Sequence, residues 1–75
     1  MEADKVLDCR GLHCPVPVVK TKKMMDSMSP GEILKVECTD KGSKADMPAF
    51  ARRTGNELLE SSEDNGVFIF FLKKK

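Results

Sequence analysis

The sequence predicts an α+β fold, a two-layer α/β sandwich in which a four-stranded mixed sheet carries two helices on one face. Three observations support this prediction. Stretches with the two-residue alternation of strands flank stretches with the 3.6-residue repeat of helices. Proline and glycine stand at the junctions between them, and an Asn-Gly pair near the end is a strong hairpin signal. The resulting order, βαβαββ, buries its apolar stripes most simply when both helices cover one face of the sheet.

The chain of 75 residues has the length of one domain, predicted to span residues 1–75. A chain of this size buries only roughly 60% of the surface that its unfolded form exposes, so the core must be thin. We therefore expect chemistry at the surface or at an edge, without an enclosed cavity, and we expect a monomer.

The first half of the chain predicts a strand, a helix and a second strand. Residues 5–9 form a short apolar strand that ends at Arg10-Gly11, and residues 15–28 have helical periodicity that ends at Ser29-Pro30-Gly31. Residues 32–39 alternate as a strand. The apolar face of the helix holds Val18, Thr21, Met25 and Met28, widened by Val19 and Met24, and that of the second strand holds Leu34, Val36 and Cys38.

The second half predicts a loop and helix over residues 40–55 and then two strands. Ser43 and Asp46 resemble a capping box, Pro48 fits the first turn, and Gly55 is a natural helix stop. Residues 56–62 and 67–73 alternate as strands that a hairpin at Asn65-Gly66 joins.

Composition excludes several classes of protein. The chain has 13 basic and 12 acidic residues, a balance that is a poor footprint for direct nucleic-acid binding. No apolar run approaches the roughly 20 residues of a membrane span, and the first ten residues do not resemble a signal peptide. Three cysteines cannot all pair within one chain, so we expect reduced thiols and a cytoplasmic location.

The stretch GLHCPVP, residues 11–17, is the main candidate for chemistry. We interpret Cys14 as the N-cap of the first helix and Pro15 as its first helical residue, because a residue before proline favours extended backbone. Pro15 and Pro17 have no amide proton, which leaves the Val16 N–H as the inferred donor to the Cys14 sulfur. With the helix dipole, this placement predicts a lowered thiol pKa, in the upper part of the range of about 3.5–7.5 seen for activated cysteines.

Neighbouring residues have either a supporting role or a purely structural one. Gly11 allows a sharp turn that leaves the sulfur exposed, and His13 could assist Cys14 electrostatically, although a loop histidine is more often only solvated. The two prolines either aim the sulfur or only start the helix, and Pro17 is expected to lie outside the core. Asp46 is interpreted as a capping residue rather than a catalytic one.

The stretch LDCRGLHCPVPVVKTKK resembles the signature of the TusA-like (SirA/YedF) sulfur-carrier family, whose hallmark is Cys-Pro-x-Pro shortly after the first strand. The resemblance continues with Pro-Gly-Glu before the second strand and with residues 46–50 in the second helix, and it spans essentially the whole chain. It implies a βαβαββ sandwich and a sulfurtransferase that accepts sulfane sulfur as a persulfide on Cys14. Pro15 and Pro17 would set the geometry of that thiol.

The resemblance also implies two protein partners, a sulfur donor such as a cysteine desulfurase or a rhodanese and a sulfur acceptor. No cofactor and no metal are implied, and tRNA thiolation, cofactor synthesis and sulfur oxidation all stay open as the pathway. Sulfur exchange needs only an accessible thiolate and a docking surface, which suits a small fold. Two positions depart from the common pattern: members that serve tRNA thiolation often carry Glu at the place of Val16, and many have Ala at the place of Cys9.

Cys9 has two interpretations. It either acts as a resolving thiol that forms a disulfide with Cys14, or it is a small apolar residue at a strand end, turned into the core; we favour the second. Cys38 is interpreted as a core residue.

Two other classes of function stay open beside the sulfur carrier. One is a non-catalytic regulatory or protein-interaction module. The other is a small metal-binding module built on a Cys3His set, for which the spacing is poor. That set would comprise Cys9, His13, Cys14 and Cys38.

Overall fold

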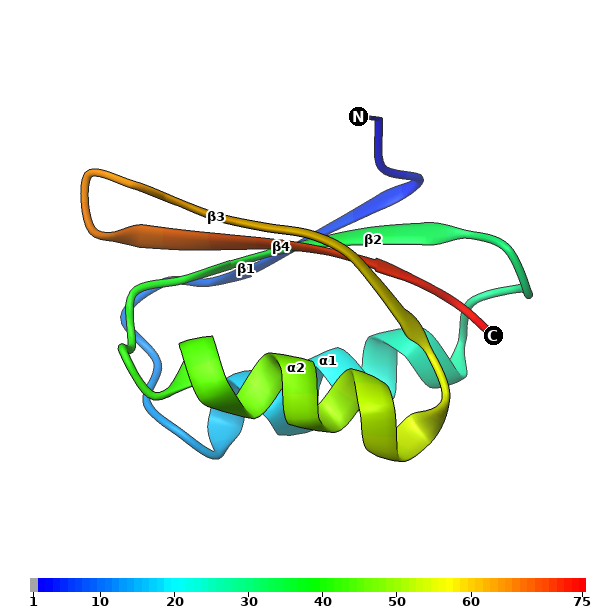
Figure 1. Cartoon of the computed structure of the whole chain (residues 1–75), viewed down its shortest axis with the longest axis horizontal. Coiled ribbons are helices and arrows are strands. Elements are labelled where there is room, and N and C mark those ends of the chain that lie inside the picture. The colour runs from blue at the N-terminus through cyan, green and yellow to red at the C-terminus, as the bar shows by residue number, and fades with distance from the viewer. Residues whose placement is uncertain (1) are drawn as a thin grey trace.

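Both helices lie on the same face of a four-stranded sheet, as Figure 1 shows. The computed structural model describes residues 2–75, so Met1, the first residue of the predicted 1–75 domain, lies outside the described residues. The elements are β1 (Lys5–Cys9), α1 (Val16–Asp26), β2 (Ile33–Cys38), α2 (Ser43–Thr54), β3 (Glu57–Asp64) and β4 (Val67–Lys73). This architecture confirms the predicted α+β sandwich and its βαβαββ order.

The sheet is mixed, with the strand order β1-β2-β4-β3. Strand β1 pairs with β2 in parallel, and the other two pairs are antiparallel. Helix α1 covers β1 and β2, and α2 covers β3 and β4. Because β1 and β2 run in the same direction, their carboxyl ends lie at the same end of the sheet. The two segments that lead into the helices begin there.

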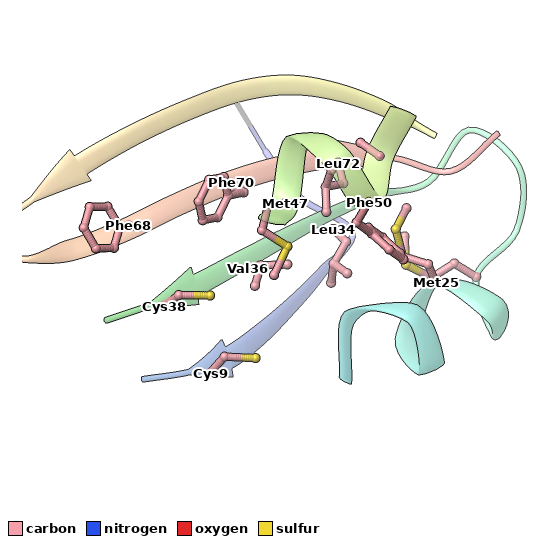
Figure 2. Packing of buried hydrophobic residues seen from close by; sticks show 12 residues of the cluster. Cys9, Met25, Leu34, Val36, Cys38, Met47, Phe50, Phe68, Phe70 and Leu72 are labelled. Carbon is pink, nitrogen blue, oxygen red and sulfur yellow. The ribbon is translucent and has the colours of Figure 1, made fainter. Parts of the chain in front are cut away.

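The core lies between the helices and the two central strands (Figure 2). Leu34, Val36 and Cys38 of β2 are fully buried on one face, as the alternation predicts. Strand β4 adds a second alternating row beside them. That row consists of Phe68, Phe70 and Leu72, and helix α2 covers it with Met47, Phe50 and Ala51.

The buried face of α1 agrees with the predicted one at Thr21 and Met25 and differs near the start of the helix. Pro17, Thr21 and Met25, four residues apart, form the buried stripe. Val18 is only half-buried, and Val19 is 50% exposed. The expectation that Pro17 lies outside the core is therefore wrong. The Thr21 hydroxyl donates to the Pro17 carbonyl at 2.7 Å, which lets this polar side chain lie on the buried face.

Both ends of α1 lie inside the predicted range 15–28. The helix ends at Asp26, where the Ser27 amide donates to the Met24 carbonyl and the Met28 amide to the Met25 carbonyl. These tight three-residue turns close the helix before the Ser-Pro-Gly stop. Met28 is nevertheless buried, so its predicted place in the core is correct.

The predicted capping box of α2 is wrong. Gly42 is the N-cap, and the Ser43 hydroxyl donates to the Asp40 carbonyl at 2.6 Å instead of capping the helix. Pro48 lies inside the helix rather than in its first turn. Gly55 ends the helix with a left-handed φ of 79°, as predicted for a glycine stop.

The C-terminal hairpin confirms the Asn-Gly prediction. Asn65 and Gly66 have φ values of 50° and 82°, the pair of positive angles that a two-residue hairpin turn of the primed type requires. Strand β3 continues to Asp64, two residues beyond the predicted 56–62, because the turn is only two residues long. Within residues 2–75, no helix is both long enough and apolar enough to cross a membrane.

Candidate functional site

Cys14 lies in the loop that joins β1 to α1, and its side chain is exposed. The loop turns directly after β1, where the Leu12 amide donates to the Cys9 carbonyl at 3.2 Å. Gly11 has a left-handed φ of 82°, which explains why glycine stands at this position, and its amide donates to the Thr39 hydroxyl at 2.8 Å. The expected sharp turn at Gly11 is confirmed.

The predicted contact between the Val16 amide and the sulfur is wrong. Pro15 is the N-cap, and Val16 is the first helical residue, so the helix begins one residue later than predicted. The Val16 amide donates to the His13 carbonyl at 2.9 Å and is therefore not available to the thiol. The Cys14–Pro15 peptide bond is cis.

Two carboxylates hold Cys14 instead. The Cys14 amide donates to Asp40 Oδ2 at 2.8 Å, and the Cys14 Sγ donates to Asp46 Oδ2 at 2.6 Å. Asp40 lies in the segment after β2, and Asp46 lies in the first half of α2. Strands β1 and β2 are parallel, and Cys9 pairs with Cys38 at their carboxyl ends. The segment that follows β2 and carries both aspartates therefore starts at the same end of the sheet as the Cys14 loop.

The surroundings of the thiol raise its pKa, so the predicted lowering is wrong. The hydrogen bond to Asp46 raises the pKa of Cys14 most, followed by partial desolvation and by the negative charges of Asp46 and Asp40. All three effects favour the protonated form. Asp40 responds in the opposite direction: the amide groups of Cys14 and Gly42, which donate to it, lower the pKa of its carboxyl.

A shallow hollow of about 190 Å³ between α1 and α2 opens beside the thiol. Cys14 and Asp46 line it, together with Pro15, Val18, Ala49, Phe50 and Arg53. Arg53 supplies a cation in an otherwise largely apolar lining. A larger hollow, of about 440 Å³ beside α2 and the start of β3, has neither cysteine nor histidine among its lining residues.

Cys9 and Cys38 lie in the core, side by side on the paired strands β1 and β2, with both side chains on the same face of the sheet (Figure 2). Both side chains are fully buried, as the core interpretation of each expects. Burial raises the pKa of Cys9, and it raises the pKa of Cys38 to about 11. Cys14 is the exposed one of the three free thiols.

The four residues of the Cys3His set divide between the core and the surface. Cys9 and Cys38 are buried, whereas His13 and Cys14 are exposed. Among residues 2–75, no group of three or more His, Cys, Asp or Glu side chains is placed to hold a metal ion. Nor, within that range, does a hydrogen bond join the His13 ring to Cys14; the positive charge of His13 acts on Asp40, whose pKa it helps to lower.

Asp40 is not among the site residues predicted from the sequence, and Asp46 has a different role from the predicted capping one. The sequence does contain a signal that both could lie near Cys14. Both follow the second predicted strand, which belongs to a strand-helix-strand unit. The carboxyl ends of parallel strands meet at one edge, and polar side chains that follow them come together there.

Several known proteins are similar to the chain. The sequence matches the protein family described as Sulfurtransferase TusA over residues 5–74. It is 51% identical over 71 residues to a protein of Allochromatium vinosum named Sulfur carrier protein TusA, an alignment that covers 95% of the chain and 93% of that relative. A Bacillus subtilis protein named Putative sulfur carrier protein YrkI is 45% identical over 74 residues, 99% of each chain.

Among solved structures, a SirA-like protein from Desulfitobacterium hafniense has the same fold, with a TM-score of 0.80 and 25% identity. The superposition covers 92% of this chain and 95% of the other.

Proposed function

The chain belongs to the sulfurtransferase TusA family, and we propose that it is a sulfur carrier that accepts sulfane sulfur as a persulfide on Cys14 and relays it to a partner protein. The family membership confirms the resemblance inferred from the Cys-Pro-x-Pro stretch. In this role the chain is a sulfurtransferase without a cofactor, and its substrates are the sulfur atoms held by other proteins.

The observation that supports Cys14 as the carrier is its exposure in contrast to the other two thiols. A sulfur relay requires an accessible sulfur atom that a second protein can reach. Cys14 is exposed at the loop before α1, whereas Cys9 and Cys38 are fully buried.

Loading of Cys14 is a thiol exchange. Its sulfur attacks the outer sulfur of a donor persulfide, the new bond joins Sγ to the sulfane sulfur, and the donor cysteine leaves with the electron pair of the broken S–S bond. Delivery repeats the same step with an acceptor thiol as the attacking group. No enclosed cavity is required, which agrees with the shallow hollow beside Cys14.

Residues around Cys14 support this role by positioning it. Gly11 makes the turn that exposes the thiol, and Pro17 anchors the start of α1 because it is buried in the core. Pro15, at the N-cap, fixes the path of the chain directly after the thiol. His13 acts on Asp40, whose pKa it helps to lower.

We propose that the donor and the acceptor both dock over the first turn of α1. Val16 and Val19 there are 41% and 50% exposed and offer apolar surface to a partner protein. Val16 is then a docking residue rather than the amide donor that the sequence suggested. A free Cys14 thiol persists best in a reducing compartment, so we assign the chain to the cytoplasm.

The test follows sulfur onto the chain and off it again. The protein is incubated with a cysteine desulfurase and cysteine and is then separated from both. Its intact mass is measured before and after mixing with an excess of an acceptor thiol. We expect one added sulfur that disappears on mixing. A non-catalytic interaction module would gain no sulfur, and a dead-end adduct would stay after mixing.

A further inference from the structure

Neither helix capping nor an ion pair explains why the Asp46 side chain lies against the thiol, although its place in the first turn of α2 suits the helix dipole. It does not cap α2, because the first amides of that helix donate to backbone carbonyls of residues 40–42. It also takes part in none of the ion pairs formed within residues 2–75; the nearby Lys44 pairs with Glu63. The side chain is half-buried, and its hydrogen bond in the structure is the one from Cys14 Sγ at 2.6 Å.

Sulfur transfer at Cys14 requires a proton to leave and to return. The nucleophile in thiol exchange is the thiolate, whereas Asp46 and Asp40 favour the protonated thiol. During delivery the same sulfur is the leaving group, and a thiol with a high pKa leaves slowly unless it is protonated. Both half-reactions therefore need a group beside Sγ that can accept a proton and give it back.

Resting on the sulfur-carrier function proposed above, we propose that Asp46 is that group, a general base for loading and a general acid for delivery. In loading, the Cys14 proton moves to Asp46 Oδ2 while Sγ bonds to the outer sulfur of the donor persulfide. The donor S–S bond breaks, its electron pair stays on the donor sulfur, and the proton then passes from Asp46 to that sulfur. In delivery Asp46 takes the proton of the attacking acceptor thiol and gives it to Cys14 Sγ as the S–S bond breaks. Thiol and persulfide exchange places in both steps, so no external oxidant or reductant is consumed.

The geometry distinguishes Asp46 from the other charged groups near Cys14. A general base must lie within about 2.6–3.2 Å of the atom whose proton it takes, and Asp46 Oδ2 meets this condition. Asp40 Oδ2 is engaged by the backbone amide instead of the sulfur. Arg53 lines the same hollow, but its guanidinium stays protonated and cannot accept a proton. Within residues 2–75, no hydrogen bond joins the His13 ring to Cys14.

Two measurements on the same variants test the proposal. Loading is followed by intact mass with glutathione persulfide as the donor, and thiolate formation is followed by the pH dependence of alkylation with iodoacetamide. The variants are Asp46→Asn, which keeps the shape but cannot take the proton, and Asp46→Glu, which keeps the carboxylate. Asp64→Asn is the matched control, because it removes one negative charge at an exposed position at the end of β3 that does not line the thiol site.

The two rates should move in opposite directions in Asp46→Asn. Alkylation at neutral pH should speed up because the carboxylate that disfavours the thiolate is gone, whereas loading should slow by at least about tenfold. Asp46→Glu should recover part of the loading, and Asp64→Asn should match the wild type in both. Loading that stays unchanged, rises with alkylation, or falls together with alkylation would overturn the proposal.

The outcome separates this proposal from the function on which it rests. If the wild type loads sulfur and Asp46→Asn loads it equally well, only the role of Asp46 fails. If the wild type takes up no sulfur while Cys14 is still alkylated, the carrier function fails and the proposal fails with it.

Discussion

The Cys14 amide donates to the carboxylate of Asp40 at 2.8 Å and so ties the loop before α1 to the segment that follows β2. The two residues are 26 positions apart in the chain. Asp40 also accepts from the Gly42 amide and, through its own carbonyl, from the Ser43 hydroxyl. One acidic residue therefore organises both the thiol loop and the start of α2.

This arrangement predicts a loss of stability in acid. The amides of Cys14 and Gly42 lower the pKa of Asp40 in the folded state, so the unfolded state binds a proton first as the pH falls. The contribution of Asp40 is complete above the ordinary carboxyl pKa of 3.8 and is lost as the pH falls through the lower folded value. Urea unfolding at pH 6 and pH 3 should show a smaller acid-induced loss in Asp40→Asn than in the wild type. An equal loss in both proteins would contradict this role.

Replacing Pro17 by alanine should destabilise the protein. Pro17 is fully buried, and the substitution removes about two methylene groups from the core. We expect the free energy of unfolding to fall by about 1–2 kcal/mol in urea titrations. Val19→Ala, at a residue 50% exposed on the same helix, is the control and should change it by less than about 0.5 kcal/mol. Equal effects of the two substitutions would contradict the observed burial.

Gly11→Ala should also cost stability, for a different reason. Within residues 2–75, no heavy atom beyond Gly11 and its two chain neighbours would lie within 4 Å of a Cβ at this position, so the cost comes from the left-handed φ of 82°. An L-residue pays about 1–2 kcal/mol for that conformation, and thermal or urea unfolding should show a loss of this size. A variant as stable as the wild type would mean that the loop can turn without a left-handed residue.

The three thiols should differ sharply in reactivity. Iodoacetamide should modify only Cys14 in the folded protein and all three cysteines in urea, because Cys9 and Cys38 are fully buried. The pH dependence of the folded reaction should give a pKa above the ordinary 9.0 for Cys14. After mild oxidation, peptide mapping should find Cys9 still free. A Cys9–Cys14 disulfide would instead support the resolving-thiol interpretation of Cys9.

Much of the fold could be predicted because it depends on local patterns. The alternation of Leu34, Val36 and Cys38 correctly identifies the buried face of β2, and Asn65-Gly66 correctly locates the hairpin turn. Helix ends were less predictable. A shift of one residue at Pro15 gives the Val16 amide to the His13 carbonyl, and the expected thiol contact is lost with it.

The electrostatics of the thiol could not be predicted from the residues next to it. Local sequence places Cys14 at a helix start, where the dipole lowers a thiol pKa. The groups that decide the direction, Asp40 and Asp46, are 26 and 32 positions away and reach the loop through the parallel pairing of β1 and β2. The direct hydrogen bond to Asp46 and the negative charges of both carboxylates raise the pKa of Cys14 instead.

Intact mass after sulfur loading tests most directly whether Cys14 carries the transferable sulfur. Wild type and Cys14→Ser are each incubated with a rhodanese and thiosulfate, and Cys38→Ser serves as the control for loss of a buried thiol. We expect the wild type to gain the mass of one sulfur, Cys38→Ser to gain it as well if it folds, and Cys14→Ser to gain none. Equal loading of Cys14→Ser and wild type would contradict the account.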